Sequence, residues 1–92
     1  MIKIVFKKAD DEIFAVFPYE SFDSYLTCYA HIGQHSLCDI NYAYDAKNAS
    51  EDEYKDLLKE LTNIYGDELV VLKKMPSRIR VAKWAVGGYL FA

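Results

Sequence analysis

Four residues near the middle of the chain have side chains that bind metals or carry out chemistry: Cys28, His31, His35 and Cys38. Their spacing, Cys-x2-His-x3-His-x2-Cys, is symmetric about Gly33. Two thiols and two imidazoles are a set of ligands that suits zinc. The pattern therefore raises the hypothesis of a zinc site.

The elements that must position these four side chains argue against that hypothesis. Aromatic and β-branched residues predict strands over residues 25–32 and 36–44, which would form a hairpin with the loop Ile32–Gly33–Gln34. In this hairpin the two histidines lie opposite each other, and so do the two cysteines. Side chains alternate between the faces of a strand, so Cys28 and His31 point to opposite sides. Only an irregular loop would bring all four ligands to one metal, and we therefore do not favour a metal site.

The same alternation divides the hairpin into two faces. One face is apolar and is expected to be core: Leu26, Cys28, Ala30, Ile32, Cys38, Ile40, Tyr42 and Tyr44. The other face is aromatic and polar, with Thr27 roughly opposite Asp39: Tyr25, Thr27, Tyr29, His31, His35, Leu37, Asp39 and Asn41. On the first face, the favoured interpretation of the cysteines is two buried free thiols in a reducing cytosol. A cross-strand disulfide stays open for an exported chain, and nothing in the sequence indicates cysteine catalysis.

The two histidines have two interpretations of similar weight. They are either hydrogen-bonded residues that secure a tight turn, or part of a site that binds a ligand or a partner. Imidazole and amide groups beside a glycine loop would suit an anionic group. The candidate binding residues in the second interpretation are Tyr29, His31, Gly33, Gln34 and His35.

The elements around this hairpin predict an α+β fold. Alternating apolar and polar residues indicate a strand hairpin over residues 2–17, ended by Pro18, with a loop over residues 19–24. A capping box at Ser50 and an apolar stripe predict a helix over residues 51–65, ended at Gly66. Residues 68–74 follow as a short strand. The order is ββββαβ plus a C-terminal segment: a mainly antiparallel sheet with one amphipathic helix on one face.

Short motifs along the chain resemble a family of uncharacterised proteins met in bacterial genomes, phages and mobile elements. The resemblance spans roughly residues 1–74. It rests on Phe17-Pro18, on residues 29–36 (YAHIGQHS), on Asn48-Ala49 with residues 53–57 (EYKDL), and on Tyr65-Gly66-Asp67. Its distinctive part is His-x-Gly-Gln-His. The histidines belong to the family pattern and the cysteines do not, and the family supplies no mechanism.

Composition bounds the remaining possibilities. The 92 residues are 52% hydrophobic and 27% charged, which indicates one globular domain over residues 1–92, with 75–92 as a tail or packing segment. The net charge of −3 hides a division. Residues 1–68 hold all 14 acidic residues and a net charge of −8, whereas residues 69–92 hold a net charge of +5.

The basic C-terminal segment is the second candidate site. The groups that would contact phosphates and stack on bases are Lys73, Lys74, Arg78, Arg80, Lys83 and Trp84. A solvated strand end explains the same charges, and we favour that explanation. The conformation of residues 77–92 is undecided between helix and strand. Their apolar end, residues 84–92, must pack on the sheet or bury itself in a partner, which includes a second copy of the chain.

These patterns favour a small, non-enzymatic, cytoplasmic protein that acts through protein contacts and has no cofactor. It would be an accessory product of a phage or mobile element, using the loop around Gly33 and the apolar C-terminal segment. No stretch approaches the length of a membrane span, and residues 1–8 lack the long apolar stretch of a signal peptide. The alternatives are a nucleic-acid-associated module that uses residues 73–83 and, less favoured, a metal-binding or hydrolytic protein around the histidines.

Overall fold

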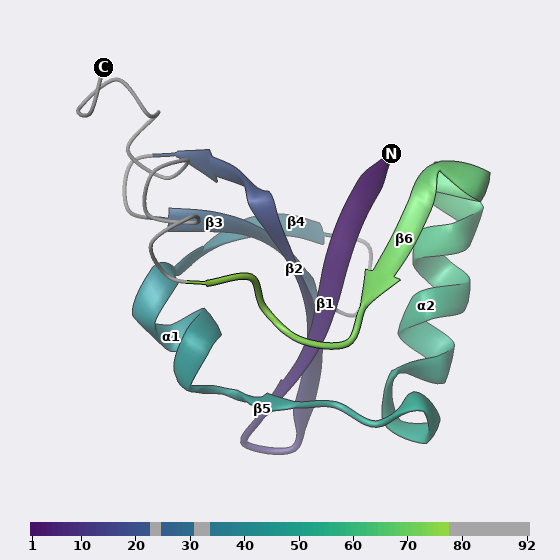
Figure 1. The fold of residues 1–92 in the computed structure, drawn as a ribbon. Helices are drawn as coiled ribbons and strands as arrows, with labels where there is room; N and C mark the ends of the chain where they lie inside the picture. The colour runs from purple at the N-terminus through teal and green to yellow at the C-terminus, as the bar shows by residue number, and fades with distance from the viewer. Residues whose placement is uncertain (23–24, 31–33, 78–92) are drawn as a thin grey trace.

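The N-terminal half of the chain folds as an antiparallel meander. The computed structural model describes three stretches, residues 1–22, 25–30 and 34–77. Within them the four strands follow in chain order and each pairs with the next (Figure 1). These strands are β1 (Ile2–Ala9), β2 (Glu12–Phe22), β3 (Tyr25–Ala30) and β4 (Gln34–Asp39).

The first hairpin confirms the strand pairing expected from the alternating pattern. Ala9 pairs with Glu12, so the loop consists of Asp10 and Asp11 alone. Both aspartates have positive φ, 50° and 65°. Two consecutive residues with positive φ are what a type I′ turn requires, and its twist matches that of the strands. Aspartate is one of the few non-glycine residues that tolerate this conformation.

The prediction that Pro18 ends the second strand is wrong, and residues 19–22 of the predicted loop belong to that strand, while residues 23–24 lie outside the described residues. β2 continues to Phe22, and Pro18 is fully buried within it. The register between β2 and β3 shifts between Phe17 and Ser21, so the proline lies in an irregular stretch of the ladder. A proline is tolerated at such a bulge because no ladder hydrogen bond is needed from its nitrogen.

The predicted fourth strand is correct in its first part and wrong in its second. β4 ends at Asp39, and residues Ile40–Asp45 form a short helix, α1. The Asp39 carboxylate accepts hydrogen bonds from the backbone N–H groups of Asn41 and Tyr42, at 2.8 Å and 3.4 Å. Asp39 is therefore the N-cap of α1, a position that aspartate favours and that ends the strand.

The long helix α2 (Glu51–Tyr65) forms as predicted. The capping box is complete: the Ser50 N–H donates to Glu53 Oε1 at 2.9 Å, and the Glu53 N–H donates to Ser50 Oγ at 3.4 Å. Lys8 on β1 donates to Glu53 Oε2, and this bond, together with that from Ser50, lowers the pKa of the Glu53 carboxyl to about 2. At the other end Gly66 has φ +62°, a region that favours glycine.

Replacing Ser50 by Ala is expected to lower the free energy of unfolding by about 1 kcal/mol, because an N–H of the first helical turn loses its acceptor. Urea unfolding followed by circular dichroism measures the change. Asn63→Ala, on the exposed side of the same helix, is the control and is expected to change stability little. Equal losses in the two variants would contradict a capping role for Ser50.

Two short strands, β5 (Lys47–Asn48) and β6 (Leu69–Leu72), complete the sheet by pairing with the edge of β1 that faces away from β2. Among the described residues the sheet has six strands in the order β4-β3-β2-β1-β5, with β6 also pairing with β1. β5 pairs antiparallel with the end of β1, and β6 pairs parallel with its beginning. A one-turn 3₁₀ helix, Gly66–Glu68, joins α2 to β6. The fold is thus α+β with a mainly antiparallel sheet, as expected.

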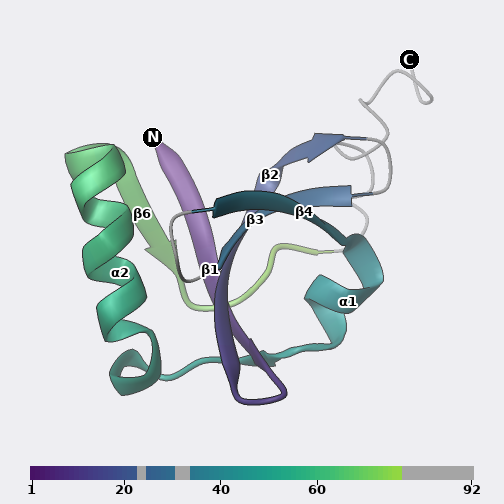
Figure 2. The ribbon, with the colours of Figure 1, turned by 180° about the vertical axis from the view of Figure 1, so that it is seen from behind.

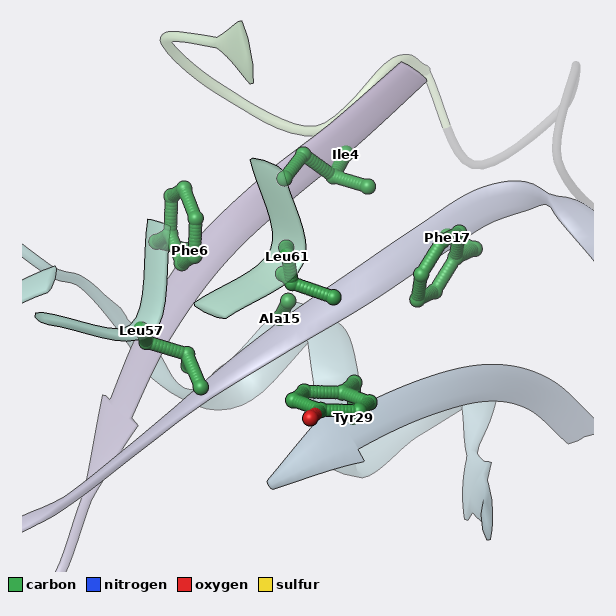
Figure 3. Close-up of a cluster of buried hydrophobic side chains, with 7 residues drawn as sticks. All are labelled: Ile4, Phe6, Ala15, Phe17, Tyr29, Leu57 and Leu61. Atoms are coloured by element: carbon green, nitrogen blue, oxygen red, sulfur yellow. The ribbon is translucent and has the colours of Figure 1, made fainter. Parts of the chain in front are cut away.

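Helices cover both faces of the sheet (Figures 1 and 2). On the α2 face one buried cluster joins the helix to β1, β2 and β3 (Figure 3): Ile4, Phe6, Ala15, Phe17, Tyr29, Leu57 and Leu61. On the other face a second cluster packs against α1 and Met75: Phe14, Val16, Leu26, Cys28 and Ala43. The segment after β6 crosses to this second face, where the Tyr44 hydroxyl donates to the Pro76 carbonyl at 2.6 Å.

Candidate functional site

The predicted binding residues Tyr29 and His35 meet on the α2 face of the β3–β4 hairpin. They are directly opposite each other in the strand register, and their rings make an edge-to-face contact with centroids 4.8 Å apart. Tyr29 is 1% exposed, whereas His35 is exposed. The face that was expected to be aromatic and polar is therefore partly core, because Tyr29 packs beneath α2 in the cluster of Figure 3.

The hydroxyl of Tyr29 ties β3 to helix α2. It donates a hydrogen bond to Glu60 Oε1 at 2.5 Å. This bond, with burial next in importance, raises the pKa of Tyr29 to about 12. A buried phenol that donates to a carboxylate is strongly held in its protonated state, so Tyr29 serves as a fixed hydrogen-bond donor inside the fold.

His35 makes the second connection between the hairpin and α2. Its Nε2 lies 2.7 Å from the Tyr65 hydroxyl in the last turn of the helix. The Phe17 ring lies close to both, with centroids 5.8 Å from His35 and 5.9 Å from Tyr65. Burial, followed by the charge of Glu20, raises the pKa of Tyr65. Of the two interpretations of His35, these contacts favour a residue that secures the hairpin.

The other predicted binding residues are placed only in part. Gln34 is the first residue of β4 and pairs with Ala30, while His31 and Gly33 lie outside the described residues. The residues that sequence reasoning missed are on α2: Glu60 and Tyr65. Glu60 follows the buried Leu57 by three positions, so its place beside the apolar stripe was the signal that it faces the sheet.

The prediction that the two cysteines lie opposite each other is wrong, because the register between β3 and β4 is shifted by two residues from the expected one. Cys28 lies opposite Ser36, and Cys38 lies opposite Leu26. For the same reason Thr27 lies opposite Leu37 rather than Asp39. A shift of two keeps every side chain on its predicted face, which is why the apolar pattern alone could not fix the register. The cysteines share the expected face and belong to the second core cluster.

The two thiols interact directly on this face and both are free. Cys28 Sγ lies 3.2 Å from the Ser36 hydroxyl and also has a hydrogen bond with the Cys38 thiol. The bond from Cys38 is the main reason that the pKa of Cys28 falls to about 6. The pKa of Cys38 is raised, chiefly because its thiol donates that bond and loses it on ionising. Above about pH 6 the two thiols therefore hold one proton between them rather than two.

The structure separates the proposed zinc ligands. Cys28 and Cys38 lie in the core cluster under α1, whereas His35 lies on the opposite, α2 face with Tyr29. In the stretches that the structure describes, no group of three or more His, Cys, Asp or Glu side chains is arranged to hold a metal ion. A single site for all four residues is therefore excluded by the position of His35.

Among the described residues of this hairpin, β4 carries most of the exposed side chains. Within the described part of the chain β4 pairs only with β3, and Figure 2 shows it at the rim of the sheet between α2 and α1. Leu37 is 53% exposed and Tyr25, on the neighbouring strand, is 44% exposed. Both lie on the same face as His35. An unpaired strand with exposed apolar side chains is a surface to which another strand can be added.

Little of the second candidate site falls within the described residues. Lys73 and Lys74 are exposed just after β6. The remaining basic and aromatic groups lie outside the described residues: Arg78, Arg80, Lys83 and Trp84. So does nearly all of the undecided segment 77–92, including its apolar end. The nucleic-acid interpretation and the association through the C-terminus stay predictions.

The fold and the hairpin define a small α+β protein with an exposed strand edge and two covered sheet faces. None of the described helices is long and apolar enough to cross a membrane. Comparison with known proteins gives no match to a family model, to a curated protein or to a solved structure. The function must therefore be argued from the site alone.

Proposed function

We propose that this chain is a small, non-enzymatic binding protein that engages another protein through the outer edge of β4. The observation that carries the proposal is that edge itself, a six-residue strand paired only with β3 among the described residues. Its side chain at position 37 is a leucine with 53% of its surface exposed. Backbone groups of an unpaired strand supply affinity for a partner strand, and alternate side chains supply selectivity.

The contacts behind the edge support this assignment. His35 and Tyr29 connect β4 and β3 to α2 through hydrogen bonds with Tyr65 and Glu60. A preorganised strand loses little conformational freedom when a partner binds. In the setting that the family resemblance implies, the protein would be an accessory product of a phage or mobile element.

Capture of partners is expected to depend on Leu37. Leu37→Lys places a charge on the edge, a substitution by which natural edge strands avoid pairing. We expect immobilised Leu37→Lys protein to retain about tenfold less of each specific partner than wild type, a loss of about 1.4 kcal/mol. Quantitative pull-down from a lysate of the source cells, read by mass spectrometry, measures the ratio.

Ile64→Lys is the matched control, because Ile64 is 51% exposed on α2 and lies outside the edge strand. It adds the same charge to the same protein and is expected to leave capture unchanged. Partners that bind wild type and Leu37→Lys equally would contradict the proposed role of β4.

A further inference from the structure

The strand β4 lacks three of the features by which natural proteins protect an exposed edge, namely a proline, a lysine and a β-bulge. Its sequence, Gln34–Asp39, contains no proline and no lysine. Its pairing with β3 is regular over all six residues, with no bulge to turn the edge away from a partner. Edge strands without such features pair readily with another strand. β4 is therefore suited to pair with an added strand, and its own sequence indicates which strand that is.

β4 is complementary to itself when paired antiparallel about Leu37. In that register Leu37 meets Leu37 of the second copy, His35 meets Asp39, and Ser36 meets Cys38. The Leu37 pair lies on the two-fold axis, and the symmetry repeats the other two pairs on the far side of that axis. Apolar pairs and pairs of basic with acidic side chains directly across two strands stabilise a sheet. The arrangement thus provides an apolar centre flanked by two His–Asp pairs.

The side chains that make these pairs are available for them. Leu37 is half exposed, and both His35 and Asp39 are exposed. Tyr65 engages His35 through Nε2, and the N–H groups of α1 engage Asp39 through Oδ1. The other ring nitrogen of His35, Nδ1, and the second carboxylate oxygen of Asp39 therefore suit a bond between the two copies.

Other registers of the same strand are less favourable. A shift by one residue would place the α2 face of one copy against the α1 face of the other. A shift by two toward the loop sets His35 opposite Leu37 and loses the two His35–Asp39 pairs. A shift by two the other way carries Ile40 and its successors into the ladder, although they form α1. The pattern of the strand thus selects Leu37 as the centre.

We propose that a second copy of this chain pairs antiparallel with β4, with Leu37 opposite Leu37 at the two-fold axis. The inference rests on the proposed function, because it names the partner of the same strand edge. The two sheets become one continuous sheet, with both α2 helices on one face and both α1 helices on the other.

Light scattering over a concentration series from about 1 to 500 μM tests the association. Wild type is expected to pass from the monomer mass of 10.6 kDa toward twice that mass. Leu37→Lys is expected to stay monomeric, since two ammonium groups would meet at the axis, and Ile64→Lys is expected to dimerise like wild type. Circular dichroism checks that each variant is folded.

Cross-linking tests the register. Paired residues on antiparallel strands have Cα atoms about 4.5–5.5 Å apart, a separation that a disulfide spans. Leu37→Cys is expected to give a covalent dimer on oxidation with diamide, and peptide mapping is expected to find the disulfide between the two introduced thiols. Thr27→Cys, on the neighbouring strand, is the control and is expected to give none through its new thiol.

The outcomes separate the inference from the function on which it rests. A wild type that is monomeric at the highest concentration overturns the inference, and so does a Leu37→Lys variant that dimerises like wild type. If that monomer still shows Leu37-dependent capture of another protein, protein binding through β4 stands and only the second copy is rejected as partner. A monomer without such capture overturns both.

Discussion

Replacing Tyr29 by Ala is expected to lower the free energy of unfolding by about 3–5 kcal/mol. The side chain is 1% exposed and lies among the residues that join α2 to the sheet. Its removal leaves a cavity beneath the helix and takes away the partner of His35 across the hairpin. Urea unfolding at equilibrium measures the loss.

Two further variants separate packing from hydrogen bonding at this position. Tyr29→Phe keeps the ring but removes the bond to Glu60, and it is expected to cost about 1.5–3 kcal/mol, the range for hydrogen bonds to a charged group. Tyr25→Ala is the control on the same strand and the same face, where 44% of the side chain is exposed. It is expected to cost much less than Tyr29→Ala. Similar losses at positions 25 and 29 would contradict the buried role of Tyr29.

Cys28 is expected to ionise near pH 6 in the folded protein, below the ordinary thiol pKa of 9.0. The thiolate accepts a hydrogen bond from Cys38, with a further bond from Ser36, and both stabilise the charged form. The ultraviolet absorbance of the thiolate, followed against pH, measures the midpoint. Cys38→Ala removes the principal donor and is expected to move the midpoint upward toward 9. A midpoint that Cys38→Ala leaves unchanged would contradict the pairing of the thiols.

The lowered pKa of Cys28 also makes the free energy of unfolding depend on pH. The folded pKa of Cys28 is lower than the unfolded value, so the unfolded chain binds more protons between about pH 6 and 9. The stability that comes from the lowered pKa of Cys28 is therefore present above about pH 9 and is lost as the pH falls through 6, whereas the raised pKa of Cys38 lowers stability as the pH rises above 9. Comparing the pH dependence of unfolding for wild type and Cys28→Ala isolates the thiol contribution from that of the carboxylates, which titrate at lower pH.

The first hairpin and the long helix were predictable because their signals are local. The alternation over residues 2–17 indicates strands without reference to the rest of the chain, and Ser50 with Glu53 marks a helix start regardless of what surrounds it. Pro18 was misleading for a different reason. Whether a proline sits in a strand depends on the neighbouring strand, and here the register shift between Phe17 and Ser21 accommodates it.

The candidate site was predictable only in part because its residues come from distant elements. Tyr29 and His35 were identified from one hairpin, but their partners Glu60 and Tyr65 lie about thirty residues further along, at sequence separations of 31 and 30. The sequence does not state which face of the sheet α2 covers. That choice decides whether Tyr29 is an exposed binding group or a buried one, and it depends on packing across the whole domain.

The position of β1 has a consequence for how the chain reaches its fold. β1 is the first strand of the sequence, but in the described part of the chain one of its two sides is paired by β5 and β6, and Ile2 pairs with Leu69. β2 can pair with β1 through a two-residue turn as soon as both exist, whereas the other side waits for almost the whole chain. The pairing of Ile2 with Leu69 closes a loop of 67 residues, and contacts between residues so far apart in the sequence slow folding because the loop entropy is lost before the contact is gained.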